Sequence, residues 1–144
     1  MKISIIAVGR CRSPSINAIA DDYLGRIKKY AAAELIEIEL KSKSAGARIG
    51  KKISPGDRVV ALDEKGKAFS SPAFAGYIDK ILMRSGRLVF LVGGADGFDR
   101  DTSSLIHEKI SLSPMTFQHD MARIVFLEQL YRAFTIMKGE PYHR

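Results

Sequence analysis

The chain of 144 residues has one cysteine, no tryptophan and no long hydrophobic segment. The single cysteine, Cys11, excludes an internal disulfide framework, because one thiol has no partner within the chain. The apolar run Ile3 to Val8 is too short for the hydrophobic region of a signal peptide, and no run is long enough to cross a bilayer. These absences predict a cytoplasmic protein with no membrane segment.

Familiar nucleotide and metal motifs are also missing. The glycine segment 93–97 reads GGADG, which lacks the G-x-G-x-x-G spacing of dinucleotide folds, and there is no Walker A sequence. His107, His119 and His143 show no metal-ligand spacing with the one cysteine, and no Ser/His/Asp order stands out. The sequence therefore predicts no metal site and no standard phosphate-binding loop.

The composition is that of one globular domain over residues 1–144. Hydrophobic residues make up 46% of the chain and charged residues 27%, which is enough apolar material for a single core. Lys and Arg outnumber Asp and Glu by 23 to 16, so the formal net charge is +7. That charge suits a polyanion such as RNA, although it also serves solubility alone.

Short apolar runs alternate with helical patterns and predict an α/β fold with a mostly parallel sheet flanked by helices. Unbroken apolar residues predict buried strands at Ile3–Val8, Arg58–Leu62 and Leu88–Val92. The period-two alternation of Glu34–Leu40 predicts a strand with one wet face, near an edge of the sheet. Repeated strand-helix-strand units favour right-handed crossovers.

Helix signals lie between these strands. Ser13 with Pro14, and later Ser71 with Pro72, are typical of helix starts, and Gly86 is a candidate left-handed end for the second helix. The Lys-, Ser- and Gly-rich segment 41–57 predicts a mobile loop, and residues 63–67 predict a turn.

The carboxyl-terminal part contains the longest helical pattern. Thr102–Lys109 predicts a short helix, Ile110–Phe117 a short strand that breaks into a loop, and Asp120–Lys138 a long helix. Apolar residues leave that helix only a narrow polar stripe, formed by Arg123, Glu128, Arg132 and Thr135. One small domain seldom covers such a helix, so we expect a homodimer packed on it about a two-fold axis, with a central core helix in a monomer as the alternative.

Two segments are candidate sites. The strand at Leu88–Val92 opens into glycines, and the carboxyl ends of strands are where open α/β sheets bind ligands. The chain ends on Tyr142, His143 and Arg144, whose side chains can exchange protons, stack on a base and hold an oxyanion. A frayed terminus is the alternative for this tail.

Specific stretches of the chain resemble a known family. They are LVGGADGF, then SLSPMTFQHDMARIVFLEQLYRAFTIMKGEPYHR, together with ISIIAVG and VVALDEKGK. This order resembles the ribosomal large-subunit pseudouridine N3-methyltransferases, which are α/β-knot enzymes of the SPOUT class. The H-x-x-x-R-x-x-x-x-E-Q-x-Y-R-A segment and the terminal Y-H-R are its specific parts. Gln118 departs from the proline of many members, and the segment between Leu40 and Arg58 is shorter than usual, which would remove a helix or change docking.

The resemblance implies a C-terminal deep trefoil knot that holds S-adenosylmethionine and needs no metal. Chains seldom thread in this way, so the knot would be one of the rare exceptions. The positions that match the family's cofactor-binding residues are Leu62, Gly93, Leu112, Ser113, Pro114, Met115, Thr116 and Phe117.

The resemblance also implies a reaction, which is methyl transfer to N3 of a pseudouridine in helix 69 of 23S rRNA, within the ribosome. His143 would act as a general base or only orient the base, Arg144 would stabilise developing charge, and Tyr142 would stack or position. By analogy the tail reaches the cofactor of the partner subunit in the homodimer. His119 and Arg123 would touch RNA or tie loops by hydrogen bonds.

Two other functions remain open at this point. The charge of +7 is equally typical of a non-catalytic RNA-binding or ribosome-assembly factor. A SPOUT-class methyltransferase that acts on tRNA or on another rRNA nucleotide is the third possibility.

Overall fold

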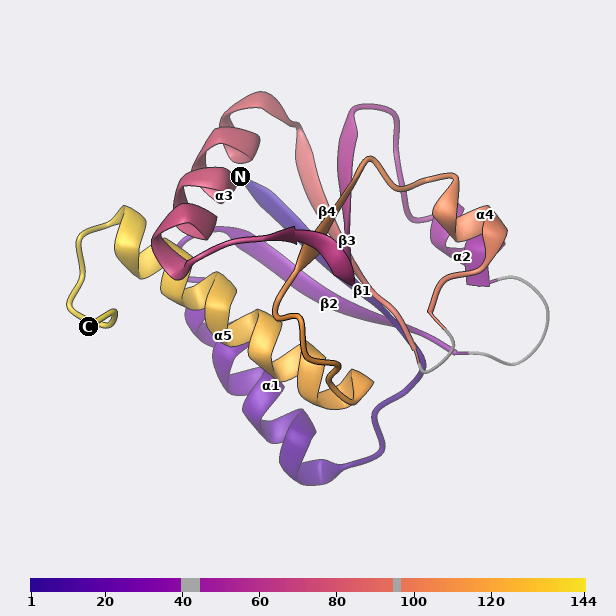
Figure 1. The fold of residues 1–144 in the computed structure, drawn as a ribbon, viewed down its shortest axis with the longest axis horizontal. Helices are drawn as coiled ribbons and strands as arrows, with labels where there is room; N and C mark the ends of the chain where they lie inside the picture. Colours follow the sequence, from indigo (N-terminus) through magenta and orange to yellow (C-terminus); the bar gives the residue numbers. More distant parts are fainter. Residues whose placement is uncertain (40–44, 95–96) are drawn as a thin grey trace.

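The computed structural model describes residues 1–39, 45–94 and 97–144 and has a five-stranded parallel sheet at its centre (Figure 1). Its strands are β1 (Lys2–Val8), β2 (Ala32–Ile38), β3 (Asp57–Ala68), β4 (Arg87–Val92) and β5 (Glu108–Ser111), in the order β2-β1-β4-β3-β5. Each neighbouring pair is parallel. The predicted parallel sheet is confirmed, with β4 at its centre and β2 at an edge as expected.

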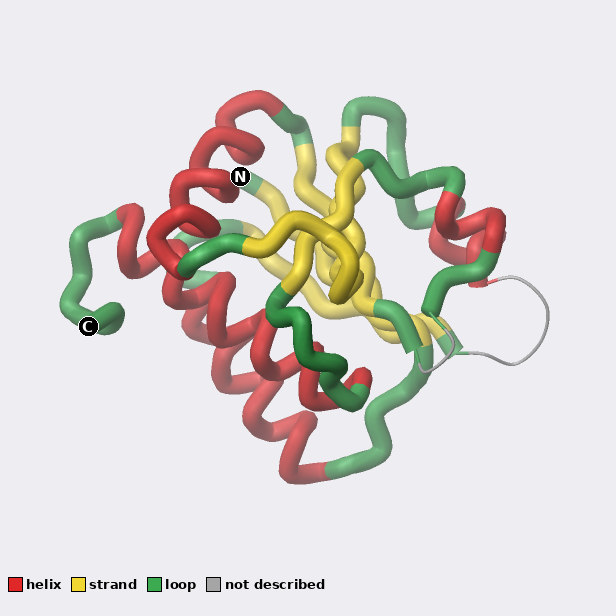
Figure 2. Tube along the Cα trace, viewed as in Figure 1, coloured by secondary structure: helices red, strands yellow, loops and turns green. Residues whose placement is uncertain are grey.

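Helices cover both faces of the sheet (Figures 1 and 2). On one face lie α1 (Pro14–Ile27), α3 (Ser71–Arg84) and α5 (His119–Met137), with α5 packed against both of the others. On the other face the short helices α2 (Ala45–Gly50) and α4 (Arg100–Ser103) pack on each other. None of the helices in the described part of the chain combines the length and apolar character that a membrane span requires.

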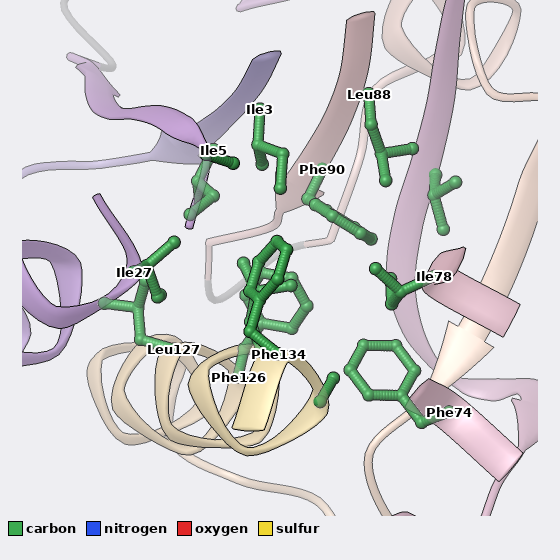
Figure 3. Close-up of a cluster of buried hydrophobic side chains, with 14 of the residues drawn as sticks. Ile3, Ile5, Ile27, Phe74, Ile78, Leu88, Phe90, Phe126, Leu127 and Phe134 are labelled. Atoms are coloured by element: carbon green, nitrogen blue, oxygen red, sulfur yellow. The ribbon is translucent and has the colours of Figure 1, made fainter. Parts of the chain in front are cut away.

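Two apolar clusters form the core, one on each face of the sheet. Along β1, Ile3 and Ile5 join the cluster under α1, α3 and α5, whereas Ile6 and Val8 join the cluster under α2. Phe90 of β4 packs against Phe126 of α5 with the rings tilted at 57° and their centroids 4.6 Å apart (Figure 3). Burial on both faces explains why these strands are unbroken apolar runs.

The helix starts follow the predicted capping chemistry, with one shift. The Ser13 hydroxyl accepts a hydrogen bond from Ile16 N–H at 3.4 Å, as predicted. For α3 the cap is Ser70 rather than Ser71, because Ser70 accepts from Ala73 N–H at 3.3 Å. Gly86 was wrongly predicted as a left-handed end, since α3 ends at Ser85 with φ −118°. The positive-φ glycines among the described residues do not include Gly86.

The predicted mobile loop at 41–57 is wrong for Ala45–Gly50, which form α2. Residues 40–44 lie outside the described residues. Ile49 is fully buried, and Gly46 lies so close to α4 that a Cβ there would stand 2.4 Å from Asp101 Cβ. A six-residue helix with one large apolar side chain has too little periodicity to detect, because its stability comes from packing on α4. The segment between Leu40 and Arg58 therefore contains a helix.

Residues 102–109 were predicted as one helix and instead form parts of two elements. α4 spans Arg100–Ser103, capped by the Asp99 carboxylate, which accepts from Thr102 N–H at 2.7 Å. β5 begins at Glu108, inside the predicted helix. The contact of β5 with β3 decides this, because a four-residue strand gains its hydrogen bonds only from its neighbour.

The turn predicted at 63–67 is also wrong, because β3 continues to Ala68. Leu62 and Lys67 both pair with Ile110 of β5, so the register shifts across the four residues between them. Gly66 is required in this irregular segment, since a Cβ would lie 2.6 Å from the Lys109 carbonyl carbon. The end of β3 then turns away from the other strands toward α3 (Figure 2).

The long helix α5 is confirmed, but its predicted polar stripe is only partly polar surface. Arg123 and Thr135 are buried, with exposed fractions of 2% and 0%. The sheet, α1 and α3 cover much of α5 within the single chain. The monomer therefore buries more of this helix than its composition suggested, and the homodimer stays a prediction.

Replacing Gly66 by Ala should destabilise the protein by about 2 kcal/mol, because the added methyl meets rigid backbone of β5. Gly76→Ala is the matched control, since Gly76 lies mid-helix in α3 with nothing within 4 Å, and the change should stabilise by about 1 kcal/mol. Urea unfolding measures both. Equal effects of the two substitutions would contradict the close approach.

A partly buried ion pair at the amino ends of β3 and β4 should make stability depend on pH. Asp57 Oδ2 lies 2.6 Å from Arg87 Nη2, and this hydrogen bond lowers the pKa of the Asp57 carboxyl. A lowered pKa adds stability that is present above the unfolded value of about 3.9 and is lost as pH falls through the folded value.

Asp57→Asn should therefore cost about 3 kcal/mol at pH 7, because Arg87 is left without its main carboxylate. Between about pH 5 and pH 2, the free energy of unfolding should also fall less in the variant than in the wild type, because the variant has no Asp57 carboxylate to protonate. Denaturant unfolding at several pH values tests this. Parallel curves of unfolding free energy against pH for the two proteins would show that this ion pair does not cause the pH dependence.

Candidate functional site

A pocket of about 560 Å³ lies beside the irregular part of β3 and the carboxyl end of β4, between the glycine segment and the amino end of α5. Three segments build its walls: the irregular part of β3, the turn after β4 and the loop after β5. The start of α5 closes it. The lining residues used below are Leu62, Asp63, Glu64, Gly93, Phe98, Lys109, Leu112, Ser113, Met115, Thr116, Phe117, Gln118, His119 and Ala122.

The structure brings together seven of the eight residues predicted to bind the cofactor. Those that line the pocket are Leu62, Gly93, Leu112, Ser113, Met115, Thr116 and Phe117. Pro114 does not line it, although it stands in the same loop. The carboxyl ends of parallel strands meet at one edge of the sheet, which is why segments distant in sequence converge here. Binding itself stays a prediction.

The backbone of the turn after β4 packs closely against one aromatic ring, that of Phe98. A Cβ at Gly93 would stand 3.3 Å from the Phe98 ring, so the backbone passes this ring with little space. Gly97 has a φ of +72°, and its N–H donates to the Gly94 carbonyl at 3.1 Å. Residues 95 and 96 of the GGADG segment lie outside the described residues. Gly93, Gly94 and Gly97 line the pocket and have no side chains, so they present backbone to it.

Side-chain hydrogen bonds shape the loop after β5. The Ser111 hydroxyl donates to the Ser113 carbonyl at 2.9 Å, and Met115 N–H donates to the Ser113 hydroxyl at 3.0 Å. The Thr116 hydroxyl donates to the Glu64 carboxylate, which joins this loop to β3 across the pocket. The loop is therefore held by local bonds at one end and by β3 at the other.

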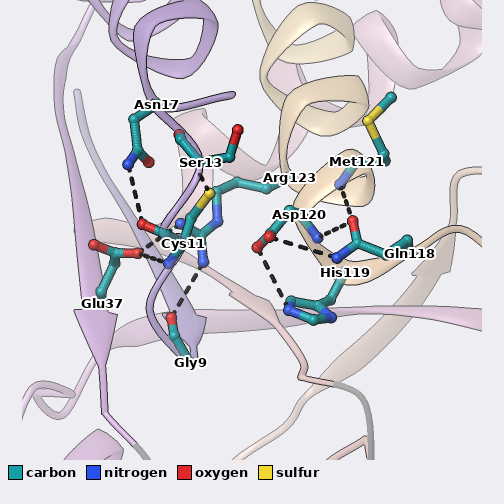
Figure 4. A network of polar contacts seen from close by, with 10 residues as sticks. All are labelled: Gly9, Cys11, Ser13, Asn17, Glu37, Gln118, His119, Asp120, Met121 and Arg123. Atoms are coloured by element: carbon teal, nitrogen blue, oxygen red, sulfur yellow. Dashed lines mark hydrogen bonds and ion pairs between the residues drawn. The ribbon is translucent and has the colours of Figure 1, made fainter. Parts of the chain in front are cut away.

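Gln118, which stands where many members of the resembled family have proline, caps the amino end of α5. Its side-chain carbonyl oxygen accepts from Asp120 N–H at 3.0 Å and from Met121 N–H at 3.1 Å (Figure 4). These two donors would otherwise be unpaired at a helix start. The departure from the family pattern thus has a structural role at the pocket wall.

Sequence reasoning missed the charged groups of the pocket. Asp63 and Glu64 enter it from β3, and Lys109 Nζ lies 3.5 Å from Asp63 Oδ2. Their only signal in the sequence was their place directly after a buried strand, which was interpreted as a turn. Within the described residues no group of three His, Cys, Asp or Glu side chains could hold a metal ion.

The predicted catalytic residues lie elsewhere in the chain, beyond the carboxyl end of α5 (Figure 1). Tyr142 packs edge-on against Tyr131 with ring centroids 4.6 Å apart, and its hydroxyl donates to Glu128 Oε1 at 3.1 Å. Burial, reinforced by hydrogen bonds with Tyr23 and Glu128, raises the pKa of the Tyr142 phenol. The tail is ordered against α5 at this residue.

His143 and Arg144 are exposed, and His143 contacts Arg132. Arg132 Nη1 lies 3.0 Å from His143 Nδ1, and because a guanidinium has only donors, Nδ1 must accept this hydrogen bond. The 19 residues of α5 span about 28 Å, and the pocket lies at the opposite end. The structure does not bring the tail to the pocket of its own chain.

Tyr142→Ala should release the tail, because it removes the ring contact with Tyr131, the hydrogen bond to Glu128 and the Arg132 cation above the ring. Tyr142→Phe keeps the ring and loses only the hydroxyl, so it is the matched control. The NMR order parameters of the Tyr142 and His143 backbone amides should fall in the alanine variant toward the flexible range, below about 0.6, and change less in the phenylalanine variant. Unchanged order parameters in both would contradict an ordered tail.

Comparison with known proteins identifies the relatives of this chain. A family model described as a predicted SPOUT methyltransferase matches residues 1–143. A ribosomal RNA large subunit methyltransferase H from Sorangium cellulosum is 42% identical over 143 residues, covering 99% of both chains. Proteins of the same name from Flavobacterium psychrophilum and Anaeromyxobacter dehalogenans are 43% and 39% identical, covering 99% and 100% of both chains.

Solved structures share the fold at low sequence identity. A probable methylase family protein from Haemophilus influenzae superposes with a TM-score of 0.60 at 14% identity, covering 99% of this chain and 70% of that one. A probable methyltransferase from Bordetella pertussis has the same TM-score and identity, covering 92% of this chain and 95% of that one.

Proposed function

Because the chain belongs to the SPOUT methyltransferase family, we propose that it methylates N3 of a pseudouridine in helix 69 of 23S rRNA. The observation that carries the proposal is the convergence of seven predicted cofactor-binding residues on one pocket. The name of the relatives, ribosomal RNA large subunit methyltransferase, supports the substrate class. The net charge of +7 suits the polyanionic partner.

S-adenosylmethionine, the methyl donor of SPOUT methyltransferases, fits the pocket in size and chemistry. The volume of about 560 Å³ lies within the range of small-molecule sites, about 300–1,000 Å³. Leu62, Leu112 and Phe117 offer apolar surface to an adenine, and the turn after β4 offers backbone amides and carbonyls. The carboxylates of Asp63 and Glu64 can accept hydrogen bonds from ribose hydroxyls or an ammonium group.

A trefoil knot around this pocket is part of the proposal. Leu62 and Lys67 of β3 both pair with Ile110 of β5. Such double pairing is expected if β3 folds around β5. The loop after β5 and the turn after β4 then line one pocket. These pairings support a chain that passes through its own loop, although such threading is rare.

The bound cofactor would supply an activated methyl group on a sulfonium, so the protein need only align N3 and remove its proton. Held by the pocket that Leu62, Leu112 and Phe117 line, the donor would give its methyl group to N3 and would be left as a neutral thioether. The N3 imide proton passes to an imidazole nitrogen of His143, since imidazole is the side chain whose unperturbed pKa lies nearest neutral pH. Arg144 stabilises charge on the adjacent carbonyl oxygens, and Tyr142 positions the base.

These roles require a second copy of the chain. The tail and the pocket stand at opposite ends of α5, so two antiparallel copies of α5 about a two-fold axis would bring each tail to the other pocket. Exposed apolar side chains at the pocket end of α5 support such a contact. They are Met115, Phe117 and Met121, with Ile19 on the adjacent helix α1.

A mixing experiment tests the shared site. Deletion of Tyr142–Arg144 leaves the pocket without a tail, and Gly93→Val leaves the tail while crowding Phe98 in the pocket. Each variant alone should be inactive, and the truncated chain should still bind S-adenosylmethionine and dimerise. A 1:1 mixture, after exchange of subunits, should regain about a quarter of wild-type activity, because half the dimers contain one complete site.

The readout is methyl transfer to large-subunit rRNA, with the modified nucleotide located by mass spectrometry. No recovery on mixing would overturn the shared site, and full activity of the truncated chain would overturn the tail's role. A methyl group on another nucleotide or on tRNA would overturn the substrate. Absence of S-adenosylmethionine binding by the wild-type protein, measured by calorimetry, would favour an RNA-binding assembly factor.

A further inference from the structure

One arginine is among the largest fully buried side chains in the protein. Arg123, in the second turn of α5, is 2% exposed and extends toward β2 and the turn after β1 (Figure 4). Its Nη1 lies 2.8 Å from Glu37 Oε2 on β2, and its Nη2 donates to the Gly9 carbonyl at 3.2 Å. A single side chain of α5 therefore contacts two segments that lie 86 and 114 residues away in sequence.

The partners of Arg123 are themselves held in place. Cys11 N–H donates to the same Glu37 oxygen at 2.7 Å, and Asn17 Nδ2 donates to the Cys11 carbonyl at 3.0 Å. Gly9 N–H donates to the Ile38 carbonyl at 2.8 Å. Burial alone would raise the pKa of the Glu37 carboxyl, but the bonds from Cys11 and Arg123 outweigh it and lower that pKa. Glu37 is thus a carboxylate at neutral pH, and its Oε2 accepts the hydrogen bonds from Cys11 and Arg123.

The turn that carries Arg123 also forms a wall of the pocket. Gln118, His119 and Ala122 line the pocket, whereas the next residue, Arg123, points away from it into the network. Arg123 and His119 lie in consecutive turns of one continuous helix, so a shift of the helix at Arg123 moves His119 with it. The network therefore fixes the position of this wall relative to β1 and β2.

Stability alone does not explain this arrangement. Arg123 is buried whereas the Glu37 side chain is 32% exposed, so their attraction is partly screened by solvent and only offsets the cost of desolvating the guanidinium. The buried Arg123 Nε has no hydrogen-bond partner among the described residues, and the buried Asp120 Oδ1 in the same turn has a contact at 3.5 Å with His119 Nε2 in place of a hydrogen bond. Unsatisfied buried groups are costly in a folded protein, and they call for a reason other than stability.

We propose that the Arg123–Glu37 pair is a positioning element of the cofactor pocket, which holds the amino end of α5 at the distance that the methyl donor requires. This inference rests on the proposed function. Neither side chain lines the pocket, so both act through His119 and Ala122. Their loss should weaken cofactor binding in a protein that remains folded.

The experiment measures S-adenosylmethionine affinity of the full chain by calorimetry, at a temperature well below the unfolding midpoint of each variant. Glu37→Gln removes one charge and Arg123→Lys removes the fork that reaches both Glu37 and Gly9. Each should weaken binding about tenfold, as expected for residues that influence a site without touching the ligand. Unchanged affinity in both, with the wild type binding, would overturn the inference alone.

The double variant Glu37→Gln, Arg123→Met separates positioning from stability. Removing both charges leaves no uncompensated ion, so the double variant should unfold at a higher temperature than Glu37→Gln alone. Its affinity for the cofactor should nevertheless stay about tenfold weak, because no side chain spans α5 and β2. Recovery of affinity together with stability would show that the pair is merely structural.

Asp57→Asn is the matched control, because it breaks a second arginine–carboxylate pair, at the opposite ends of the strands. It should lower stability and leave affinity unchanged, whereas weaker binding in this variant too would overturn a specific role for Arg123. If the wild-type chain itself does not bind S-adenosylmethionine, the proposed function fails, and this inference fails with it.

Discussion

The parallel direction of all five strands is the constraint on which the rest of the structure depends. It places the carboxyl ends of β3, β4 and β5 at one edge, where the chain must leave the sheet as loops. Those loops hold the apolar, polar and charged groups of the pocket, while the buried strands beneath them provide a rigid base. The site is thus a consequence of topology before it is a consequence of any one side chain.

The helix α5 links the two parts of the proposed active site. Its amino end closes the pocket and is anchored by Arg123 to β2 and the turn after β1. Its carboxyl end supports the tail through Tyr131 and Glu128. A rigid helix keeps these ends about 28 Å apart. This separation is the physical reason for proposing that pocket and tail act together only across two copies of the chain.

Much of the architecture followed from local patterns. The apolar runs of β1 and β4 correspond to burial on both faces of the sheet. The alternation of β2 corresponds to burial on one face, and the long apolar stripe of α5 to burial of most of the helix surface. The elements that were missed are short or irregular. α2 is stable through its contact with α4, and the second half of β3 through its pairing with β5. Neither contact leaves a periodic signal, because the partner lies far away in sequence.

For the site, the sequence by itself determined the glycine turn and the Tyr-His-Arg ending from their chemistry, and its resemblance to a known family grouped Leu62, Gly93 and 112–117 as candidate binding residues. Tertiary structure alone decided that Asp63 and Glu64 line the same pocket and that Arg123 is buried rather than exposed. The reason is physical: composition and spacing describe what a side chain can do, whereas its neighbours are chosen by how distant strands and helices pack.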